Sequence, residues 1–139
     1  MIEIKPLTSV GQIRFGMNRE QVRTLLADVP KAFKRTEVSD EETDYFVEKG
    51  LQVIYAADGH CCAVEAMSPA EVIFRGKQIF PADFDVAAPL LAEADPQLIK
   101  DSSGVLSVSL SIGIYAPSHR ENPRTPLESI LAGEEGYYR

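Results

Sequence analysis

Three neighbouring residues combine an imidazole with two thiols, which are groups that can act together in nucleophilic catalysis. They are His60, Cys61 and Cys62, which include both cysteines and one of the two histidines. An imidazole can activate a thiolate as a nucleophile, and in an extended strand His60 and Cys62 lie on the same face. A small hydrolase or transferase that uses Cys62 is therefore one hypothesis. The alternative is a hairpin end with buried, unreactive thiols, because no carboxylate stands at an obvious position to orient His60.

The adjacency of the cysteines argues against a bridge or a metal site. Successive strand residues point to opposite faces, so Cys61 and Cys62 do not meet the geometry of a disulfide. Two sulfurs reach one zinc ion when about two to four residues separate them, and here no residue does. The sequence therefore predicts no disulfide framework, no metal ligand and no cofactor.

A long alternating run supplies the first candidate binding surface. Over residues 106–114 every second residue is apolar, and Ser107, Ser109, Ser111 and a glycine stand between them. This alternation predicts one strand whose apolar side packs on the core while its small polar side stays open. Serine hydroxyls both donate and accept hydrogen bonds, so the open side suits a docked protein surface or peptide. The alternative is an ordinary solvent-facing side of a sheet.

An acidic stretch supplies the second candidate surface. It contains Glu37, Asp40, Glu41, Glu42 and Asp44. The stretch is not a calcium loop, because it lacks the glycine that such a loop needs at its sixth position. As an exposed edge it would select a basic partner, since complementary charge speeds association. The alternative is an ordinary solvated turn.

A polar loop between prolines supplies the third candidate surface. His119 and Arg120 lie in this loop, which runs over residues 118–125. Their side chains suit an acidic partner or an anion. The alternative is a solvated loop that its prolines make rigid.

Length and charge limit the classes of protein to consider. At 139 residues, with 45% apolar residues, the chain is long enough for one domain with its own core. Its 21 acidic and 14 basic residues give a net charge of -7, which argues against a general nucleic-acid binder. No stretch has the pattern of a signal peptide or the length of a membrane span, so we expect a soluble, cytoplasmic protein.

The elements that would position these side chains are short helices and hairpins. A helix is predicted over 18–27, where Asn18 and Gln21 match a capping box. A second helix is predicted after Asp83, and Pro89 should either kink it or limit it to little more than two turns. Turn signals at 58–59 and 75–77 predict two β-hairpins.

The two halves of the sequence are similar to each other. Residues 43–55 align with residues 103–115 without a gap, and the apolar positions of the two predicted helices also correspond. This similarity predicts an α+β fold of two tandem repeats, of about 1–74 and 75–139. Each repeat would be a helix followed by antiparallel strands, with the helices packed on one face of the sheet and the whole forming a single domain, 1–139.

One short motif resembles a known fold family. The segment Ile13-Arg14-Phe15-Gly16-Met17, followed by Asn18-Arg19-Glu20-Gln21-Val22 and Leu25-Leu26, resembles the start of a helix in the beta-lactamase inhibitory protein-like fold. That resemblance implies tandem units of a helix and a β-meander, and it transfers no individual binding residue. Members of that group that are secreted or lipid-anchored carry export signals, which this chain lacks. A second resemblance is to a group of uncharacterised bacterial proteins, some of them suspected immunity partners of toxins. It is based on the closing Gly136-Tyr137-Tyr138 together with Leu51 to Tyr55 and Gly113-Ile114-Tyr115-Ala116-Pro117.

Together these features lead to a hypothesis of a non-enzymatic protein-binding module. The sharpest version is an immunity or inhibitor protein that binds a basic toxin, because an acidic domain of this size suits such a partner. The Cys62-dependent hydrolase or transferase is the alternative from another class. Exposed sheet edges also leave open a homodimer rather than a monomer.

Overall fold

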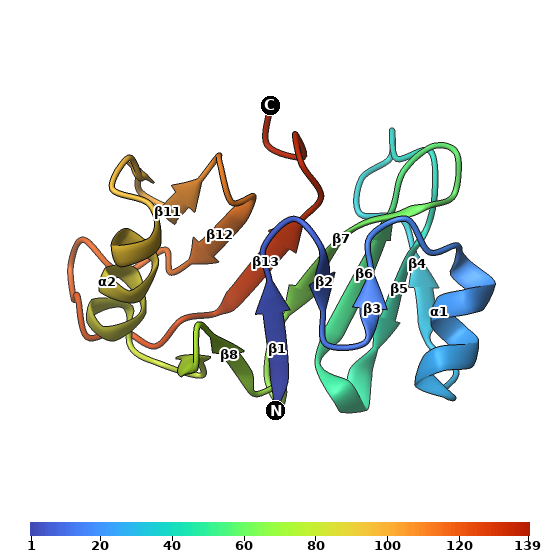
Figure 1. The fold of residues 1–139 in the computed structure, drawn as a ribbon, viewed down its shortest axis with the longest axis horizontal. Helices are drawn as coiled ribbons and strands as arrows, with labels where there is room; N and C mark the ends of the chain where they lie inside the picture. Colours follow the sequence, from blue (N-terminus) through green and yellow to red (C-terminus); the bar gives the residue numbers. More distant parts are fainter.

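The largest element of the structure is an eight-stranded antiparallel sheet (Figure 1). The computed structural model describes residues 1–139. The strand order is β10-β11-β12-β13-β7-β6-β5-β4, so the sheet joins two groups of strands at the β13–β7 pair. The strands are β4 (Lys31–Phe33), β5 (Thr43–Phe46), β6 (Leu51–Tyr55), β7 (Cys61–Ala66), β10 (Ile99–Lys100), β11 (Gly104–Ser107), β12 (Ile112–Tyr115) and β13 (Ser129–Gly133). A short 3-10 helix, η1 (Val47–Lys49), connects β5 to β6.

A second, five-stranded sheet has the order β3-β2-β1-β8-β9. Its strands are β1 (Ile2–Lys5), β2 (Ser9–Val10), β3 (Ile13–Arg14), β8 (Val72–Phe74) and β9 (Lys77–Phe80). The β1–β8 pair is parallel and the other three pairs are antiparallel. The N-terminal strand therefore lies beside a strand about seventy residues further along the chain, at the centre of this sheet.

Two α-helices lie at opposite ends of the long axis of the molecule (Figure 1). Helix α1 (Arg19–Leu26) has the predicted capping box, in which the side chains of Asn18 and Gln21 bond to each other's backbone N–H groups. Helix α2 (Phe84–Ala94) follows Asp83, whose side chain makes no capping bond. Of the two predicted effects of Pro89, the limit of little more than two turns is not found. The helix has 11 residues, and Pro89 faces solvent, where it removes only one helical hydrogen bond.

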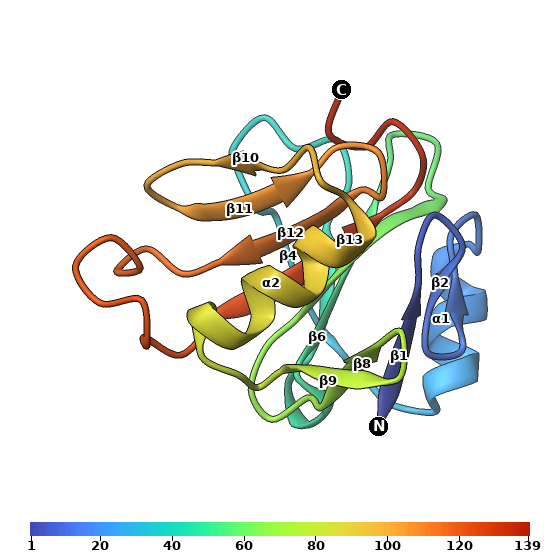
Figure 2. The ribbon, with the colours of Figure 1, turned by 60° about the vertical axis from the view of Figure 1, so that its left-hand side comes forward.

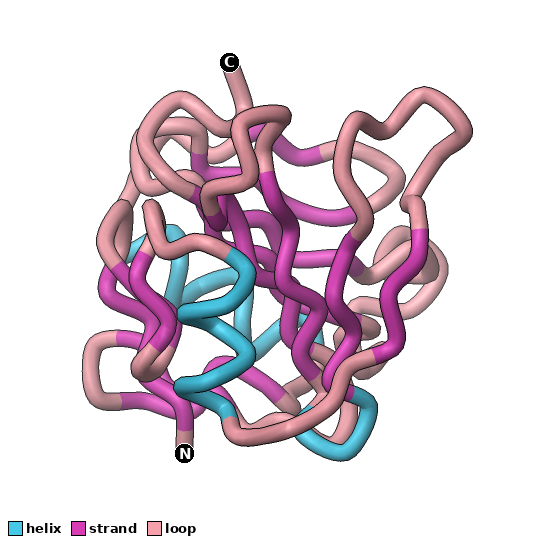
Figure 3. Tube along the Cα trace, turned by 90° about the vertical axis from the view of Figure 1, so that its right-hand side faces the viewer, coloured by secondary structure: helices cyan, strands magenta, loops and turns pink.

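The main core lies between the larger sheet and the layer formed by the helices and the smaller sheet. Figure 2 shows α2, β8, β9 and β1 in front of the larger sheet, and Figure 3 shows the strands near the N-terminus to the left of it. We call this covered side the inner face and the opposite side the outer face. Strand register places one row of side chains across each face. The inner row is Ser107, Ile112, Ala132, Val64, Val53, Asp44 and Ala32. The outer row is Ile99, Leu106, Gly113, Leu131, Glu65, Gln52, Tyr45 and Lys31.

This architecture overturns the predicted α+β fold of two tandem helix-plus-strand repeats. The structure is mostly sheet, with thirteen strands in two sheets and only two short α-helices. The repeat scheme contained no second sheet, because the β1–β8 pairing joins residues too far apart for a local pattern to reveal. The expected limit of the first repeat, Phe74, lies at the start of the turn in the β8–β9 hairpin. The two hairpin turns at 58–59 and 75–77 are confirmed.

The prediction of one long strand over residues 106–114 is also wrong. The segment forms β11 and β12, joined by a tight turn at residues 108–111. Ser107 and Ile112 are direct partners across these strands, so they point to the same, inner face. The turn contains no glycine, proline, asparagine or aspartate, which are the residues that usually indicate a turn. The alternation of serine and apolar residues continues through it, so the sequence pattern does not predict the turn. Ser107 and Ser111 are buried, while only Ser109 is exposed.

Ser111 is a weak point of this turn and gives a testable prediction. Its φ is +53°, and its buried hydroxyl has no hydrogen-bond partner. Ser111→Gly should raise the free energy of unfolding by about 1 kcal/mol, since it relieves the left-handed strain and removes an unsatisfied polar group. Urea denaturation measures the change. Ser109→Gly should instead destabilise the protein, because the Ser109 hydroxyl donates to Asp95 and its φ is negative. Equal effects of the two substitutions would contradict the prediction.

Neither helix is long and apolar enough to cross a lipid bilayer.

Candidate functional site

The outer face of the larger sheet carries the most accessible combination of apolar, aromatic and charged side chains. Strands β10 to β12 present Ile99, Leu106 and Tyr115 there, and Ile99 and Tyr115 are 52% and 43% exposed. No helix packs on this face, whereas the inner face is covered along its length. Most of this exposed apolar area therefore lies on the half of the sheet formed by β10, β11, β12 and β13, and Phe33 of β4, 36% exposed, is the exception at the other edge.

A polar network holds the centre of the outer face. The Ser129 hydroxyl donates to Glu65 at 2.6 Å, and the Arg35 guanidinium donates to the other Glu65 oxygen at 3.2 Å and to Gln52 at 2.8 Å. Arg35 comes from the chain after β4 and reaches over β6 and β7. The carboxylate of Glu65 is therefore partly neutralised from one side only.

The C-terminal segment covers part of the outer face with two tyrosines. A Cβ atom on Gly133 would lie 2.7 Å from the side chain of Tyr137, and one on Gly113 would lie 2.6 Å from the Tyr138 hydroxyl. Glycine at these two positions leaves the space that the rings occupy. The rings meet edge to face, with centroids 5.2 Å apart. Burial raises the pKa of both phenols. The two tyrosines are therefore a fixed part of this surface.

A groove of about 280 Å³ lies between the C-terminal tyrosines and the β10–β11 turn. Its lining comes mainly from β11, β12 and β13. The lining residues are Glu65, Asp101, Ser103, Gly104, Val105, Leu106, Gly113, Ile114, Tyr115, Ser129, Leu131 and Tyr138. No lysine, arginine or histidine is among them, and because Glu65 is paired with Arg35, the unpaired negative charge of the groove is that of Asp101.

His60 fastens the C-terminal segment to the β6–β7 hairpin. Its Nε2 atom lies 2.9 and 2.8 Å from the two Glu134 carboxylate oxygens, and its Nδ1 atom contacts the Asp58 carboxylate. Glu134 also donates its backbone N–H to the carbonyl of Cys62 at 2.8 Å. Hydrogen bonds that His60 donates to Glu134, and then to Asp58, raise the pKa of His60, and the contacts with His60 lower the pKa of Asp58. Two carboxylates that the sequence pattern did not single out therefore orient His60, namely Asp58, two residues before it, and Glu134, 74 residues after it.

The raised pKa of His60 predicts how stability depends on pH. Below the ordinary histidine pKa of about 6.5 the His60 ring is charged in both the folded and the unfolded protein. Its ion pairs in the folded protein then make their full contribution to stability. That contribution is lost as pH rises through the folded pKa. His60→Gln should therefore cost about 0.5 to 1 kcal/mol at about pH 5.5 and less at about pH 9. Urea denaturation at both pH values tests this, and a cost that grows with pH would contradict it.

The two cysteines do not have the setting of a nucleophile. Burial raises the pKa of Cys61 to about 12 and that of Cys62 to about 11, whereas a reactive thiol needs a lowered pKa. The Cys62 sulfur lies in a small apolar cluster with Ile54 and Ala63, and its contact is the Ile54 carbonyl, not His60. No group of three or more His, Cys, Asp or Glu side chains converges in a geometry that would hold a metal ion.

The predicted acidic edge divides into an exposed part and a buried part. Glu37, Asp40 and Glu42 are exposed, and Glu41 is partly exposed, in the loop between β4 and β5. Asp44 lies in β5 on the inner face and is completely buried. It accepts hydrogen bonds from Arg19 and Arg23 of α1 and from the Tyr55 hydroxyl. Asp44 is therefore a structural residue that joins α1 to the sheet, outside the exposed edge.

The other predicted site residues also separate. His119 is buried, with its ring stacked on Phe84 at 4.4 Å and its Nε2 atom 2.6 Å from the Asp101 carbonyl. Arg120, its neighbour, is exposed. Ser107 and Ser109 both donate to Asp95 at the end of α2, and the Ser107 hydroxyl lowers the pKa of that carboxylate. None of the three predicted serines therefore faces an open sheet surface.

Comparisons with protein-family models, with curated proteins and with solved structures gave no match to this chain. The resemblance of residues 13–26 to the beta-lactamase inhibitory protein-like fold therefore stays a prediction. Function has to be inferred from the chemistry of the surface itself.

A second groove, of about 490 Å³, lies between α1 and the smaller sheet. Ile2, Leu25 and Leu26 give it an apolar wall, while Lys49 and Glu71 lie on its rim. Its rim therefore carries both signs of charge and does not select a partner by charge. The outer face, whose groove contains the unpaired Asp101 carboxylate and no lining cation, is the more selective surface.

Proposed function

We propose that this protein is a non-enzymatic, cytoplasmic protein-binding module that receives a basic protein partner on the outer face of its larger sheet. The observation that carries the proposal is the acidic groove, which lies beside exposed apolar side chains on a sheet face without a covering helix. Tyrosine is an effective anchor of protein interfaces, because its ring buries much area at small entropic cost.

Charge supports a basic partner. The whole chain has a net charge of -7, and the exposed acidic loop after β4 adds to the field at the edge of the same sheet. Such a field raises the rate of encounter with a positively charged surface and disfavours acidic partners. An inhibitor or immunity protein that masks a basic toxin is the specific role that fits these features best.

A capture experiment with matched variants tests the proposal. Tagged protein is used to capture partners from a lysate of its native host, and captured proteins are identified by mass spectrometry. Tyr115→Arg changes the outer face, whereas Val86→Arg places the same charge on an exposed position of α2. We expect the wild type and Val86→Arg to retain one basic protein in stoichiometric amount, and Tyr115→Arg to lose it. Circular dichroism shows that both variants are folded.

Three outcomes would contradict the proposal. They are capture of no stoichiometric partner, capture that Tyr115→Arg leaves unchanged, and a captured partner with an acidic surface. Light scattering at two concentrations adds a separate check, since self-association that Tyr115→Arg abolishes would assign the outer face to a homodimer instead.

A further inference from the structure

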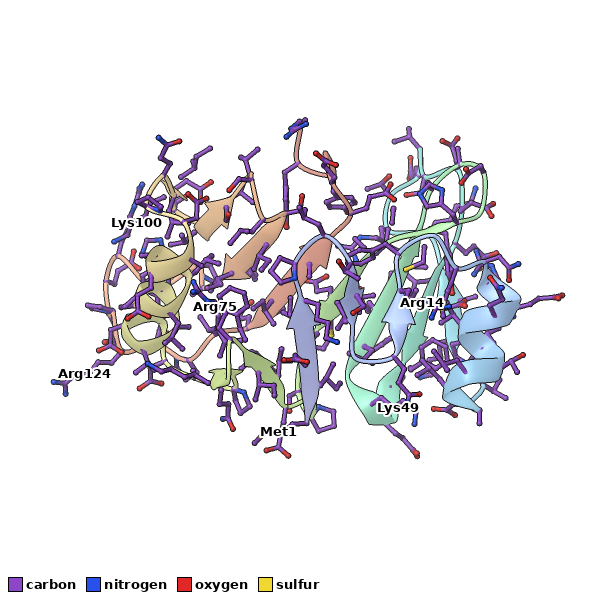
Figure 4. All side chains as sticks on the ribbon, in the orientation of Figure 1. Met1, Arg14, Lys49, Arg75, Lys100 and Arg124 are labelled. Carbon is purple, nitrogen blue, oxygen red and sulfur yellow. The ribbon has the colours of Figure 1, made fainter.

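The outer-face groove combines two carboxylates with two tyrosines, and one of these carboxylates, Glu65, is already paired with Arg35 at 3.2 Å. Glu65 and Asp101 provide the carboxylates, and Tyr115 and Tyr138 provide the rings. The nearest candidate cation on β10, Lys100, lies beside α2 (Figure 4), where its ammonium nitrogen is 5.5 Å from the centre of the Phe84 ring. The negative charge of the groove is therefore not balanced from β10.

Asp101 presents a fixed carboxylate with one unused oxygen. Its Oδ1 atom accepts the backbone N–H groups of Ser103 and Gly104 at 2.7 and 3.1 Å. Its Oδ2 atom has no hydrogen-bond partner in the protein, and the residue is exposed. The backbone bonds hold the carboxylate in place, so the free oxygen needs little ordering to accept a donor.

Elsewhere in this protein, a carboxylate and a tyrosine ring that lie close together bind one arginine side chain. On the inner face, the Arg19 guanidinium lies 4.3 Å from the centre of the Tyr55 ring while it donates to the Asp44 carboxylate at 2.7 Å. A planar guanidinium can stack on a ring and bond a carboxylate at the same time, whereas an ammonium group cannot stack in this way. The inner-face site thus contains a carboxylate, a tyrosine and an arginine, and the groove contains the first two.

We infer that the groove receives an arginine side chain from the surface of the partner. The guanidinium bonds the free Oδ2 of Asp101, which is the carboxylate of the groove without a cationic partner, and stacks on Tyr115 or Tyr138. This inference rests on the proposed function, since it names the partner group that the outer face binds. It makes the groove an anchor point within a larger interface.

Nuclear magnetic resonance tests the inference without the natural partner. The ¹⁵N-labelled protein is titrated with acetyl-Gly-Arg-Gly-amide and with the same peptide containing citrulline or norleucine in place of arginine. Citrulline keeps the shape of arginine and lacks its charge. We expect saturable shift changes at Gly104, Gly113 and Tyr115 with the arginine peptide, and at least a fivefold weaker response with the other two, on the order expected for loss of one charge-assisted contact.

Variants of the protein show where the peptide binds. Asp101→Asn keeps an oxygen to accept the two backbone bonds and removes the charge, so it should weaken the arginine peptide by about fivefold. Glu93→Gln removes an exposed charge on α2 and should change nothing. Equal binding of the arginine and norleucine peptides, no binding of any peptide, or no effect of Asp101→Asn would overturn the inference. The proposed function would survive these outcomes if capture of the partner still depends on Tyr115.

Discussion

Replacing Asp44 by alanine should lower the free energy of unfolding by about 3 to 5 kcal/mol. The carboxylate has no exposed surface and accepts four hydrogen bonds, three from the guanidinium groups of Arg19 and Arg23 and one from Tyr55. The substitution leaves these donors without their acceptor. The hydroxyl of Tyr55 is buried and cannot turn to water, and burial together with Asp44 raises its pKa. Urea denaturation measures the loss.

Two controls separate the loss of this cluster from a general effect of charge. Asp40→Ala removes a carboxylate from the exposed loop four residues earlier and should change stability by less than about 0.5 kcal/mol. Asp44→Asn keeps the volume of the side chain and one acceptor oxygen. Its loss of stability should therefore lie between those of Asp44→Ala and Asp40→Ala. An Asp44→Ala protein as stable as Asp40→Ala would show that α1 does not depend on these ion pairs for its place on the sheet.

The contrast between Asp40 and Asp44 also shows what the sequence does and does not reveal. Both residues belong to one acidic stretch, and nothing in the local pattern separates them. The register of β5 turns Asp44 inward, opposite the arginines of α1, and that register depends on pairing with β6. Local signals predicted α1 and the two hairpins correctly, because capping and turn residues act over a few positions.

Long-range pairing accounts for the rest of the differences. The β1–β8 pair builds a second sheet from residues far apart in the chain, and no periodicity marks it. The salt bridge between His60 and Glu134, and the packing of Tyr138 on Gly113, join the end of the chain to earlier strands in the same way. Gly113 and Gly133 each stand in a strand, where glycine is unfavourable, and this was the one sequence signal that pointed to close packing on the outer face.

Substitution of Gly104 by alanine should cost about 3 to 4 kcal/mol of stability, because it forces a Cβ atom into the backbone of the neighbouring strand. The added atom would lie 1.9 Å from the Ile114 carbonyl oxygen, and φ at this residue is +152°. Strand β12 cannot move away, because it pairs with β13 on its other side. The clash therefore has to open the β11–β12 pair.

Gly76→Ala is the matched control for this prediction. Gly76 also has a positive φ, of +81°, but no atom lies within 4 Å of its Cβ position, so its cost should be only the backbone strain of about 1 to 2 kcal/mol. Urea denaturation of the two variants isolates the steric part as their difference. Hydrogen exchange then locates the damage, since Gly104→Ala should speed exchange of the amides in β11 and β12 and leave α1 protected. Equal losses of stability in the two variants would contradict the prediction. They would show that β11 and β12, which form one wall of the groove, can separate at this point without cost.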